Sequence, residues 1–567
     1  MAAKTTLKET TSSSNLNTES KGGHLAISYP LVILAAIVAI LYMGSLNFGY
    51  TDLDDTIFIK ETQAYNEQFS NLLHSFHRGV FSESNDTYYR PLLLDSYVIN
   101  NALSETDVKG YHAMNLLFHL LSVLLLFVLF KKVGLDKLKS FLLTLLFAVH
   151  PVLSQAVVWI PGRNDTILAM FAFGFVICVL DYIRTQKAQF LLAQFVCLLA
   201  ALFTKETAVF VAPACLMLCF ALPSFNWKDR KSFVLYGTWV LAIAAWFVIR
   251  SMATIKNDPI QLSTLARNFP MRLSLTIQYL GKIFLPFNLS VFPMLNETSY
   301  VFGILAVIGL GVLLYVSKAR NKVMIFAGFS WFMLILFPLF ILPSALNDQD
   351  FEHRLYLPIV GILFVLSQTA LFQNMKERTT AMVVVAIAIL FAGINVMHQQ
   401  QFSNPISFWT GAVKTTPNSA YANMMLAARI NESDPIRGDQ LMRNAYQLNP
   451  NEKYVNYYLG KVFLEKNNID SAERYLLAEL KGSAYFDTYF LMSRVALEKR
   501  DSLASLNYMQ TYLEKDPGNS QAMNNYILLL CQTNQYDRAK TFIRKKQEEQ
   551  IAVPKALVDL VNGVLPK

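Results

Sequence analysis

A series of uninterrupted apolar runs between residues 27 and 397 constrains this chain more than any other feature. An apolar run of about 17 to 25 residues is long enough to cross the hydrocarbon core of a membrane as a helix. Eleven crossings are expected, at 27–46, 113–130, 139–158, 166–183, 189–204, 206–222, 233–250, 300–317, 323–343, 355–373 and 379–397. With 54% hydrophobic and only 16% charged residues, the chain is predicted to be an all-α polytopic membrane protein.

Basic residues predict the orientation, because short cytoplasmic loops are enriched in Lys and Arg. All the basic clusters share one side if residues 251–298 stay on the other side. Ser274 to Phe292 is therefore interpreted as a helix lying in the membrane interface, since Lys282 and Pro286 interrupt its apolar pattern. The N-terminus is then cytoplasmic, and the chain beyond residue 400 is extracytoplasmic.

The composition divides the chain into three parts. Residues 1–25 are polar and are predicted to form a disordered cytoplasmic tail. Residues 26–400 form the membrane domain, and its first extracytoplasmic loop spans 47–112. Residues 401–567 are polar and helical, and prolines 417, 450 and 517 follow a period near 33 or 34 residues. That period predicts helical hairpins that resemble tetratricopeptide repeats, which stack into a solenoid and bind partner proteins. The alternative is a stabilising cap over the membrane domain.

Cysteine positions and net charge exclude several kinds of protein. Of five cysteines, only Cys531 lies outside the predicted spans, so neither a disulfide framework nor a zinc site is expected. The net charge of +9 comes largely from the inner loops and the tail. It therefore reflects membrane topology and does not indicate a nucleic-acid partner.

Asp54 and Asp55 directly follow the first span, where carboxylates are expensive to desolvate. They could cap a helix in the loop, or they could act in catalysis. Other polar candidates expected on the same face are Arg90, His112, His150, Arg163, Asp165, Lys205, Glu206, His353 and Arg354. Some of these could instead form ion pairs for folding, such as Arg163 with Asp165 or Lys205 with Glu206. Cations beside a carboxylate pair suit a reaction in which a phosphate leaves and a hydroxyl attacks.

Seven motifs occur in an order that resembles the transmembrane and tetratricopeptide-repeat-containing O-mannosyltransferases of the GT-C superfamily. They are DD after the first span, YYRPL, HAMNLLFHLLSVLLLFVL, HPVLSQAVVWIPGRND, FTKETA, EHRLYLP, and FW..AV...P.SA..N..M at the start of the repeats. The chain departs from the family at Gln155, where Glu is frequent, and at Glu352-His353, where Ala-Glu is frequent.

The resemblance implies an inverting enzyme with a GT-C membrane domain. It would move a sugar, expected to be mannose, from a polyisoprenyl phosphate to Ser or Thr hydroxyls of translocated proteins. Asp54 would be the general base, and Asp55 would support it or position the acceptor. Arg354, Arg163 and Lys205, in that order, would bind the donor phosphate. Supporting or acceptor-side roles would fall to Arg90, His112, His150, Asp165, Glu206 and His353. No cofactor or metal ion is expected, and the repeats would bind the acceptor protein.

Two other functions remain open from the sequence. One is a GT-C transferase that acts on a lipid or polysaccharide, and the other is a non-enzymatic membrane scaffold that displays the repeats. Five Asn-x-Ser/Thr sequences lie on the predicted outer side, at Asn85, Asn164, Asn288, Asn296 and Asn431. Glycans there would obstruct the site, so a bacterial inner membrane with periplasmic repeats is favoured over the endoplasmic reticulum.

Overall fold

The computed structural model describes residues 29–81, 88–223, 225–254, 262–341, 349–482, 485–549 and 551–563. The predicted tail at 1–25 and the Asn85 sequence therefore lie outside the described residues. Within those ranges the chain is helical, and the extended pairing is confined to an isolated bridge between Met294 and Gln349. The all-α prediction is confirmed.

Six helices are long and apolar enough to cross a membrane. They are Tyr29–Asn47 (α1 with a following turn), Val108–Val133 (α5), Ile160–Thr185 (mostly α8), Arg230–Ala253 (α11), Lys322–Ile341 (α15) and Glu377–Phe402 (mostly α18). A seventh candidate combines α6, Lys137–Val149, with Pro151–Val158, and it is bent by 52°. All seven coincide with predicted runs, and the chain is an integral membrane protein.

The other four predicted runs are shorter or broken. Ala188–Thr204 (α9), Glu206–Cys219 (ending in α10) and Val301–Tyr315 (α14) are apolar helices of 10–17 residues. The run at 355–373 divides into α16, Ile359–Leu366, and α17, Ala370–Gln373. The count of eleven crossings therefore stays a prediction.

The expected interfacial helix at 274–292 differs from the structure. The helix α13 covers only Leu275–Phe284, and α12, Leu262–Leu273, precedes it. It packs so closely on α14 that a Cβ on Gly281 would lie 2.6 Å from the backbone nitrogen of Gly303. Its Lys282 is fully buried, so this polar residue lies inside the protein and not on a surface.

The C-terminal region consists of four helical hairpins. Their pairs are α20 (Ala420–Ile430) with α21 (Pro435–Leu448), α22 (Val455–Glu465) with α23 (Ile469–Gly482), α24 (Asp487–Glu498) with α25 (Ser502–Lys515), and α26 (Ser520–Gln532) with α27 (Tyr536–Glu548). Successive hairpins begin 35, 32 and 33 residues apart, close to the predicted period. Side chains of Ser419, Asp434, Asp501 and Asn519 cap four of these helices.

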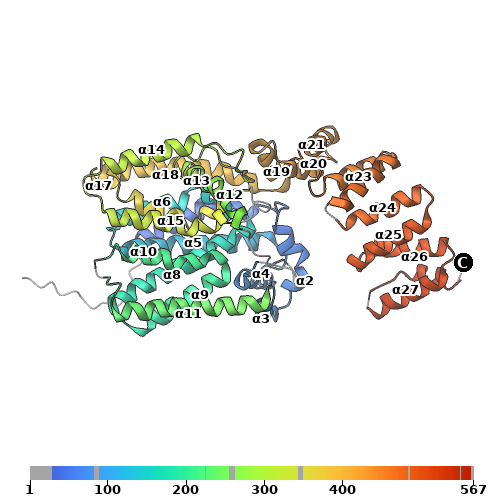
Figure 1. The fold of residues 1–567 in the computed structure, drawn as a ribbon, viewed down its shortest axis with the longest axis horizontal. Coiled ribbons are helices and arrows are strands. Elements are labelled where there is room, and N and C mark those ends of the chain that lie inside the picture. Colours follow the sequence, from blue (N-terminus) through green and yellow to red (C-terminus); the bar gives the residue numbers. More distant parts are fainter. Residues whose placement is uncertain are drawn as a thin grey trace, which may run out of the picture.

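The hairpins stack beyond one end of the membrane helices (Figure 1). The helix α19, Pro405–Thr415, joins α18 to this stack. The first loop contributes three short helices at the same end of the membrane helices: α2 (Gln63–Asn66), α3 (Asn71–His74) and α4 (Pro91–Ser104). The fold therefore places the first loop next to the start of the repeats.

Candidate active site

The Asp55 carboxylate closes the first loop from within. Its Oδ2 accepts hydrogen bonds from the backbone nitrogen of Thr51 (2.5 Å) and from the Thr51 hydroxyl (3.0 Å). Its Oδ1 accepts from the backbone nitrogens of Leu53 and Thr56, each at 3.2 Å. Burial raises the pKa of Asp55, and the bonds from Thr51 lower it. Asp55 therefore shapes the loop that carries Asp54.

Asp54 lies next to Asp55, but its carboxylate accepts none of the hydrogen bonds that close the loop. Among the residues that the structure describes, its carboxylate has no hydrogen-bond or ion-pair partner. Burial and the neighbouring Asp55 raise the pKa of Asp54 to about 6, although Arg90 lowers it. A carboxylate with this pKa is ionised at neutral pH and is a stronger base than an ordinary aspartate.

Replacing Asp55 by alanine is expected to destabilise the first loop. The change removes an acceptor for four hydrogen bonds and leaves the buried backbone nitrogen of Thr51 unpaired. The free energy of unfolding should fall by about 2 kcal/mol or more. Asp55→Asn keeps one amide oxygen as an acceptor and should lie between alanine and the wild type. Thermal unfolding in detergent measures the series, and an unchanged midpoint for Asp55→Ala would contradict the loop-closing role.

Two ion pairs lie close to each other, and Arg90 of the first pair acts on the Asp54 carboxyl. Arg90 Nε lies 2.9 Å from Glu206 Oε2, and Glu206 Oε1 accepts a 2.8 Å hydrogen bond from the backbone nitrogen of Tyr89. Burial lowers the pKa of Arg90, but Glu206 raises it further, so this guanidinium is firmly protonated. Lys205 Nζ donates to both oxygens of Asp165, at 2.7 and 2.8 Å.

These partners differ from the ion pairs considered from the sequence. Lys205 pairs with Asp165 and not with Glu206, and Asp165 does not pair with Arg163. Residues two apart on a helix point to different sides, so Arg163 and Asp165 cannot meet on α8. Asp165 and Glu206 instead pair with Lys205 and Arg90, which lie far from them in the sequence.

Arg163 is completely buried and engaged by neutral groups. Its Nε donates to Asn115 Oδ1 (2.8 Å), and one Nη donates to Asn100 Oδ1 and to the Tyr111 carbonyl, each at 3.0 Å. The other Nη donates to the Ser96 carbonyl, and the guanidinium lies over the Tyr97 ring. Arg163 therefore joins α4, α5 and α8, and contact with a donor phosphate would require these bonds to break.

His353 and Arg354 lie on the turn Glu352–Leu355, beside the Lys205–Asp165 pair. The His353 ring lies against Trp159 and Phe351, and its Nε2 is 3.9 Å from Asp165 Oδ2. Arg354 is half-buried, and its Nη1 donates to the Gln349 carbonyl at 2.9 Å. The turn therefore places His353 and Arg354 beside Lys205, although these residues are far apart in the sequence.

Three further residues have structural contacts. Gln155, at a position where the chain departs from the family, accepts from the His353 backbone nitrogen (3.1 Å) and donates to the Val291 carbonyl (3.0 Å). The Nε2 of His150 lies 2.8 Å from the Ile283 carbonyl. His112 is buried and packs edge-on against Phe48.

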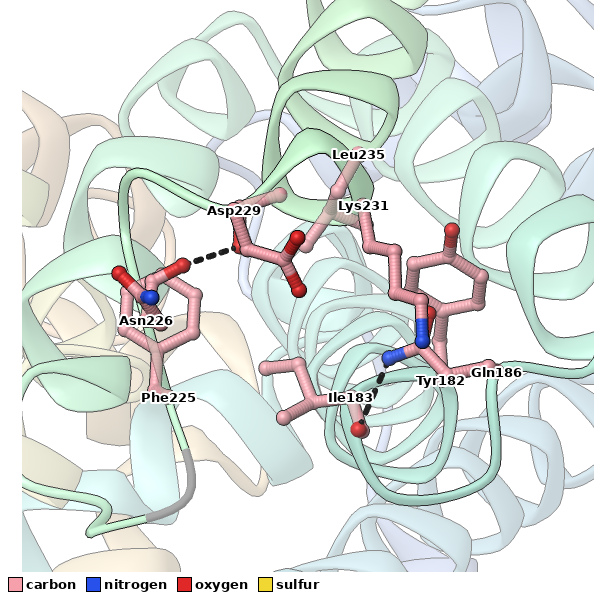
Figure 2. A pocket seen from close by; sticks show the side chains of 9 residues that line it. Tyr182, Ile183, Gln186, Phe225, Asn226, Asp229, Lys231 and Leu235 are labelled. Carbon is pink, nitrogen blue, oxygen red and sulfur yellow. Dashed lines mark hydrogen bonds between the residues drawn. The ribbon is translucent and has the colours of Figure 1, made fainter.

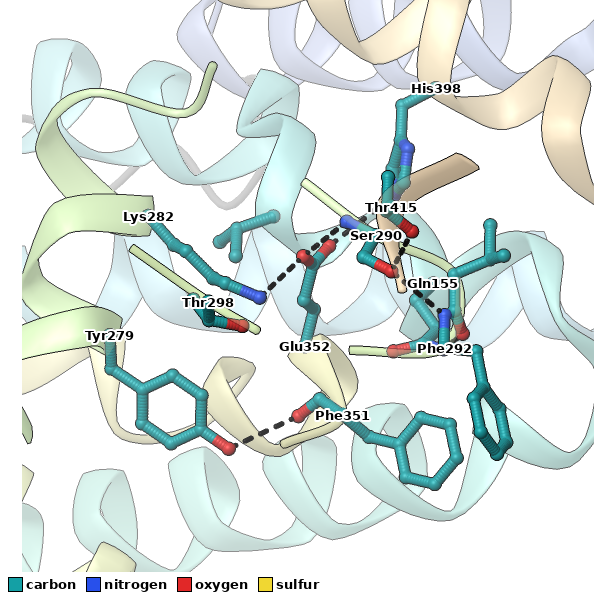
Figure 3. A network of polar contacts seen from close by, with 12 residues as sticks. Gln155, Tyr279, Lys282, Ser290, Phe292, Thr298, Phe351, Glu352, His398 and Thr415 are labelled. Atoms are coloured by element: carbon teal, nitrogen blue, oxygen red, sulfur yellow. Dashed lines mark hydrogen bonds and ion pairs between the residues drawn. The ribbon is translucent and has the colours of Figure 1, made fainter. Parts of the chain in front are cut away.

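A buried network that the sequence did not predict adjoins the turn (Figure 3). Lys282 Nζ lies 2.9 Å from Glu352 Oε1, which also accepts from the Ser290 backbone nitrogen at 2.8 Å. His398 Nε2 lies 3.3 Å from the other oxygen of Glu352. The available signal was a lysine within an apolar stretch, because buried charges in membrane proteins pair with one another.

A small hollow of about 50 Å³ lies between the end of α8 and the start of α11 (Figure 2). Tyr182, Gln186, Asp229 and Lys231 are among its lining residues, and it contains none of the predicted site residues. The residues that the structure describes hold no group of three His, Cys, Asp or Glu side chains suited to a metal ion. Independence from metal stays an expectation.

Comparisons with known proteins bear on the resemblance. No family model matches the chain. Protein O-mannosyl-transferase TMTC3 of Homo sapiens is 29% identical over 162 residues, which cover 28% of this chain and 17% of that protein. TMTC1 of Mus musculus is 30% identical over 169 residues, 27% of this chain and 18% of that protein. These homologues confirm the predicted resemblance to O-mannosyltransferases, although the match spans less than a fifth of their length.

A solved structure also has similarity to the chain. It is an oligosaccharyltransferase of Archaeoglobus fulgidus tethered to an acceptor peptide, with 13% identity and a TM-score of 0.37. The similarity covers 66% of this chain and 55% of that one.

Proposed function

We propose that the chain is a protein O-glycosyltransferase that moves mannose from a polyisoprenyl phosphate to Ser or Thr hydroxyls. The observation that carries this proposal is the partly buried Asp54 carboxylate, which has a pKa of about 6 and no hydrogen-bond or ion-pair partner among the described residues. The homologous O-mannosyltransferases support the class of reaction. We assign the reaction to the extracytoplasmic face, where the predicted orientation places the first loop.

In the proposed reaction, the acceptor hydroxyl attacks the anomeric carbon from the side opposite the phosphate. The bond between the anomeric carbon and the phosphate oxygen breaks, and its electron pair leaves with the phosphate, so the configuration inverts. Asp54 takes the proton of the hydroxyl. Cations stabilise the phosphate that leaves, so no general acid is required.

Arg90, Lys205 and Arg354 are the cations that we assign to the phosphate. Arg90 uses only its Nε for Glu206, its guanidinium lies over the Tyr88 ring, and its two Nη atoms have no hydrogen-bond partner among the described residues. It also lies close enough to Asp54 to lower the pKa of that carboxyl. We therefore assign to Arg90 the phosphate-binding role that was predicted for Arg163, whose donors are engaged inside the protein.

A reconstituted assay tests the proposal. The purified protein in lipid nanodiscs would receive polyprenyl-phosphate mannose, together with secreted-protein peptides that contain either Ser/Thr or Ala in their place. We expect mannose on the Ser/Thr peptides alone, in the configuration opposite to that of the donor. GDP-mannose serves as the control donor and should give no product. Transfer to a lipid or polysaccharide acceptor instead of the peptide would contradict the proposal.

The pH dependence of transfer follows from Asp54. The base must be ionised, so the rate should be half-maximal near pH 6 and should fall about tenfold for each further unit of acidity. The acid limb of the pH profile should lie about two pH units above the limb expected for an ordinary aspartate, because burial and Asp55 favour the protonated form of Asp54. Initial rates from pH 4 to 8 measure it, and a rate that is constant down to pH 4.5 would exclude this base.

A further inference from the structure

The first loop is attached to the helices that open the repeat region. We call residues 49–55 the base loop. The backbone nitrogen of Gly49 donates to the Ser403 carbonyl at 2.8 Å. Two residues later, the Thr51 carbonyl accepts from the indole nitrogen of Trp409 at 3.1 Å. Trp409 lies on α19 and is fully buried, so this bond is shielded from water.

Asp52 provides the next attachment, to the first repeat helix. Arg429 of α20 has its Nε 3.4 Å from Asp52 Oδ2, and one Nη donates to the Asp52 carbonyl at 3.5 Å. The other Nη donates to the Met425 carbonyl at 3.0 Å, and the guanidinium lies over the Trp409 ring. Arg429 is therefore fixed by its own helix before it reaches the loop.

The backbone of Asp52 shows why the loop needs external contacts. Its φ is +55°, in the left-handed region that few residues other than glycine adopt. Such a conformation persists when surrounding contacts determine it, and it is common beside functional sites. The contacts from Trp409 and Arg429 flank this residue. Thr51, which Trp409 holds, also donates to Asp55, so the position of both acids depends on the same contacts.

We propose that Arg429 and Trp409 are positioning residues of the transferase, and that the first repeat thereby sets the geometry of Asp54. The inference rests on the proposed function, because it assigns a purpose to the loop that carries the base. The repeat region then acts in catalysis as well as in acceptor binding. A displacement of α20 when the repeats bind an acceptor would move the base loop directly.

Kinetics of Arg429→Gln, Asp52→Asn and their double variant test the proposal. Asparagine also accepts the left-handed conformation, so Asp52→Asn removes the charge without adding backbone strain. Each single variant should lower kcat by about ten- to a hundredfold with an unchanged KM for the donor. The double variant should be no slower than the singles, because both remove one contact. Arg443→Gln is the control, since Arg443 pairs with Asp439 on the exposed side of α21.

The acid limb of the pH profile is a second readout. The titratable and charged groups that act on Asp54 are Asp55, Arg90, Tyr97 of α4 and Tyr421 of α20. A freed base loop lets water reach Asp54, so the limb in Arg429→Gln should move from near pH 6 toward lower pH. A mutation that only destabilised the fold would reduce the amount of active enzyme and leave the pH of the acid limb unchanged.

Hydrogen exchange separates the inference from the proposed function. Amides 49–56 should exchange faster in Arg429→Gln and Trp409→Phe than in the wild type or Arg443→Gln. Unchanged exchange, or an unchanged kcat in an active enzyme, would overturn the positioning role. If the wild type transfers no sugar in the reconstituted assay, the proposed function fails, and the exchange of the base loop still decides whether the first repeat holds this loop.

Discussion

Replacing Asp54 by asparagine is expected to abolish most sugar transfer while the protein stays folded. The amide cannot accept the proton of the attacking hydroxyl, so the rate should fall by about 10²- to 10⁴-fold. The donor should still bind, because the change leaves Arg90, Lys205 and Arg354 in place. Single-turnover transfer and equilibrium donor binding measure the two effects separately.

Asp54→Asn is also expected to stabilise the protein. The folded-state pKa of Asp54 is raised from 3.8 to about 6, so folding favours its protonated form. This stability is fully present below the unfolded pKa and is lost as the pH rises through about 6. At pH 7.5 the ionised carboxylate destabilises the folded state by roughly 2 to 3 kcal/mol, which asparagine removes. The melting temperature should therefore rise at pH 7.5, and the gain should shrink toward pH 4.

The two acids provide a matched pair for this test. Asp55→Asn alters the closure of the loop, so it should lower both stability and transfer. Asp54→Asn should lower transfer alone. The scaffold alternative predicts no transfer by the wild type or by either variant, and it gives the Asp55 carboxylate a role in stability alone. Full transfer by Asp54→Asn would contradict the general base.

Hydropathy predicted the long helices because the length of an apolar run depends on local sequence alone. Seven predicted runs coincide with helices or with a bent helix pair of spanning length. The run at 355–373 was not predicted to break after Leu366, although the three polar residues Ser367, Gln368 and Thr369 stand at the break. The period of the hairpins could also be predicted from local sequence, because each repeat contains its own turn and capping residues.

The ion pairs could not be predicted because each one joins distant segments. Lys205 meets Asp165 from 40 residues away, and Arg90 meets Glu206 from 116. Sequence proximity suggested Arg163 with Asp165, but the helix turns these side chains apart. The family resemblance assigned different roles to Asp54 and Asp55, but the hydrogen bonds that distinguish them were equally hidden, because they depend on which backbone nitrogens face each carboxylate.

Lys282 gives the largest expected effect on stability. Burial raises the pKa of Glu352, but Lys282 and His398 lower it further, so this buried carboxylate is ionised. Lys282→Met removes its closest cation and leaves the buried carboxylate with only His398 and the Ser290 backbone nitrogen as partners. The free energy of unfolding should fall by about 3 to 5 kcal/mol. Lys461→Met, at an exposed site on α22, should change it by less than about 0.5 kcal/mol.

The double variant Lys282→Met/Glu352→Gln distinguishes an uncompensated charge from a loss of packing. Glutamine keeps an oxygen that can accept from the Ser290 backbone nitrogen but carries no charge. If the loss in Lys282→Met comes from the unpaired carboxylate, the double variant should recover most of it. A double variant as unstable as the single one would assign the loss to packing around the lysine stem. Recovery would also show that the stability of the Glu352–Leu355 turn, which carries Arg354, requires the charge of Glu352 to be neutralised by Lys282.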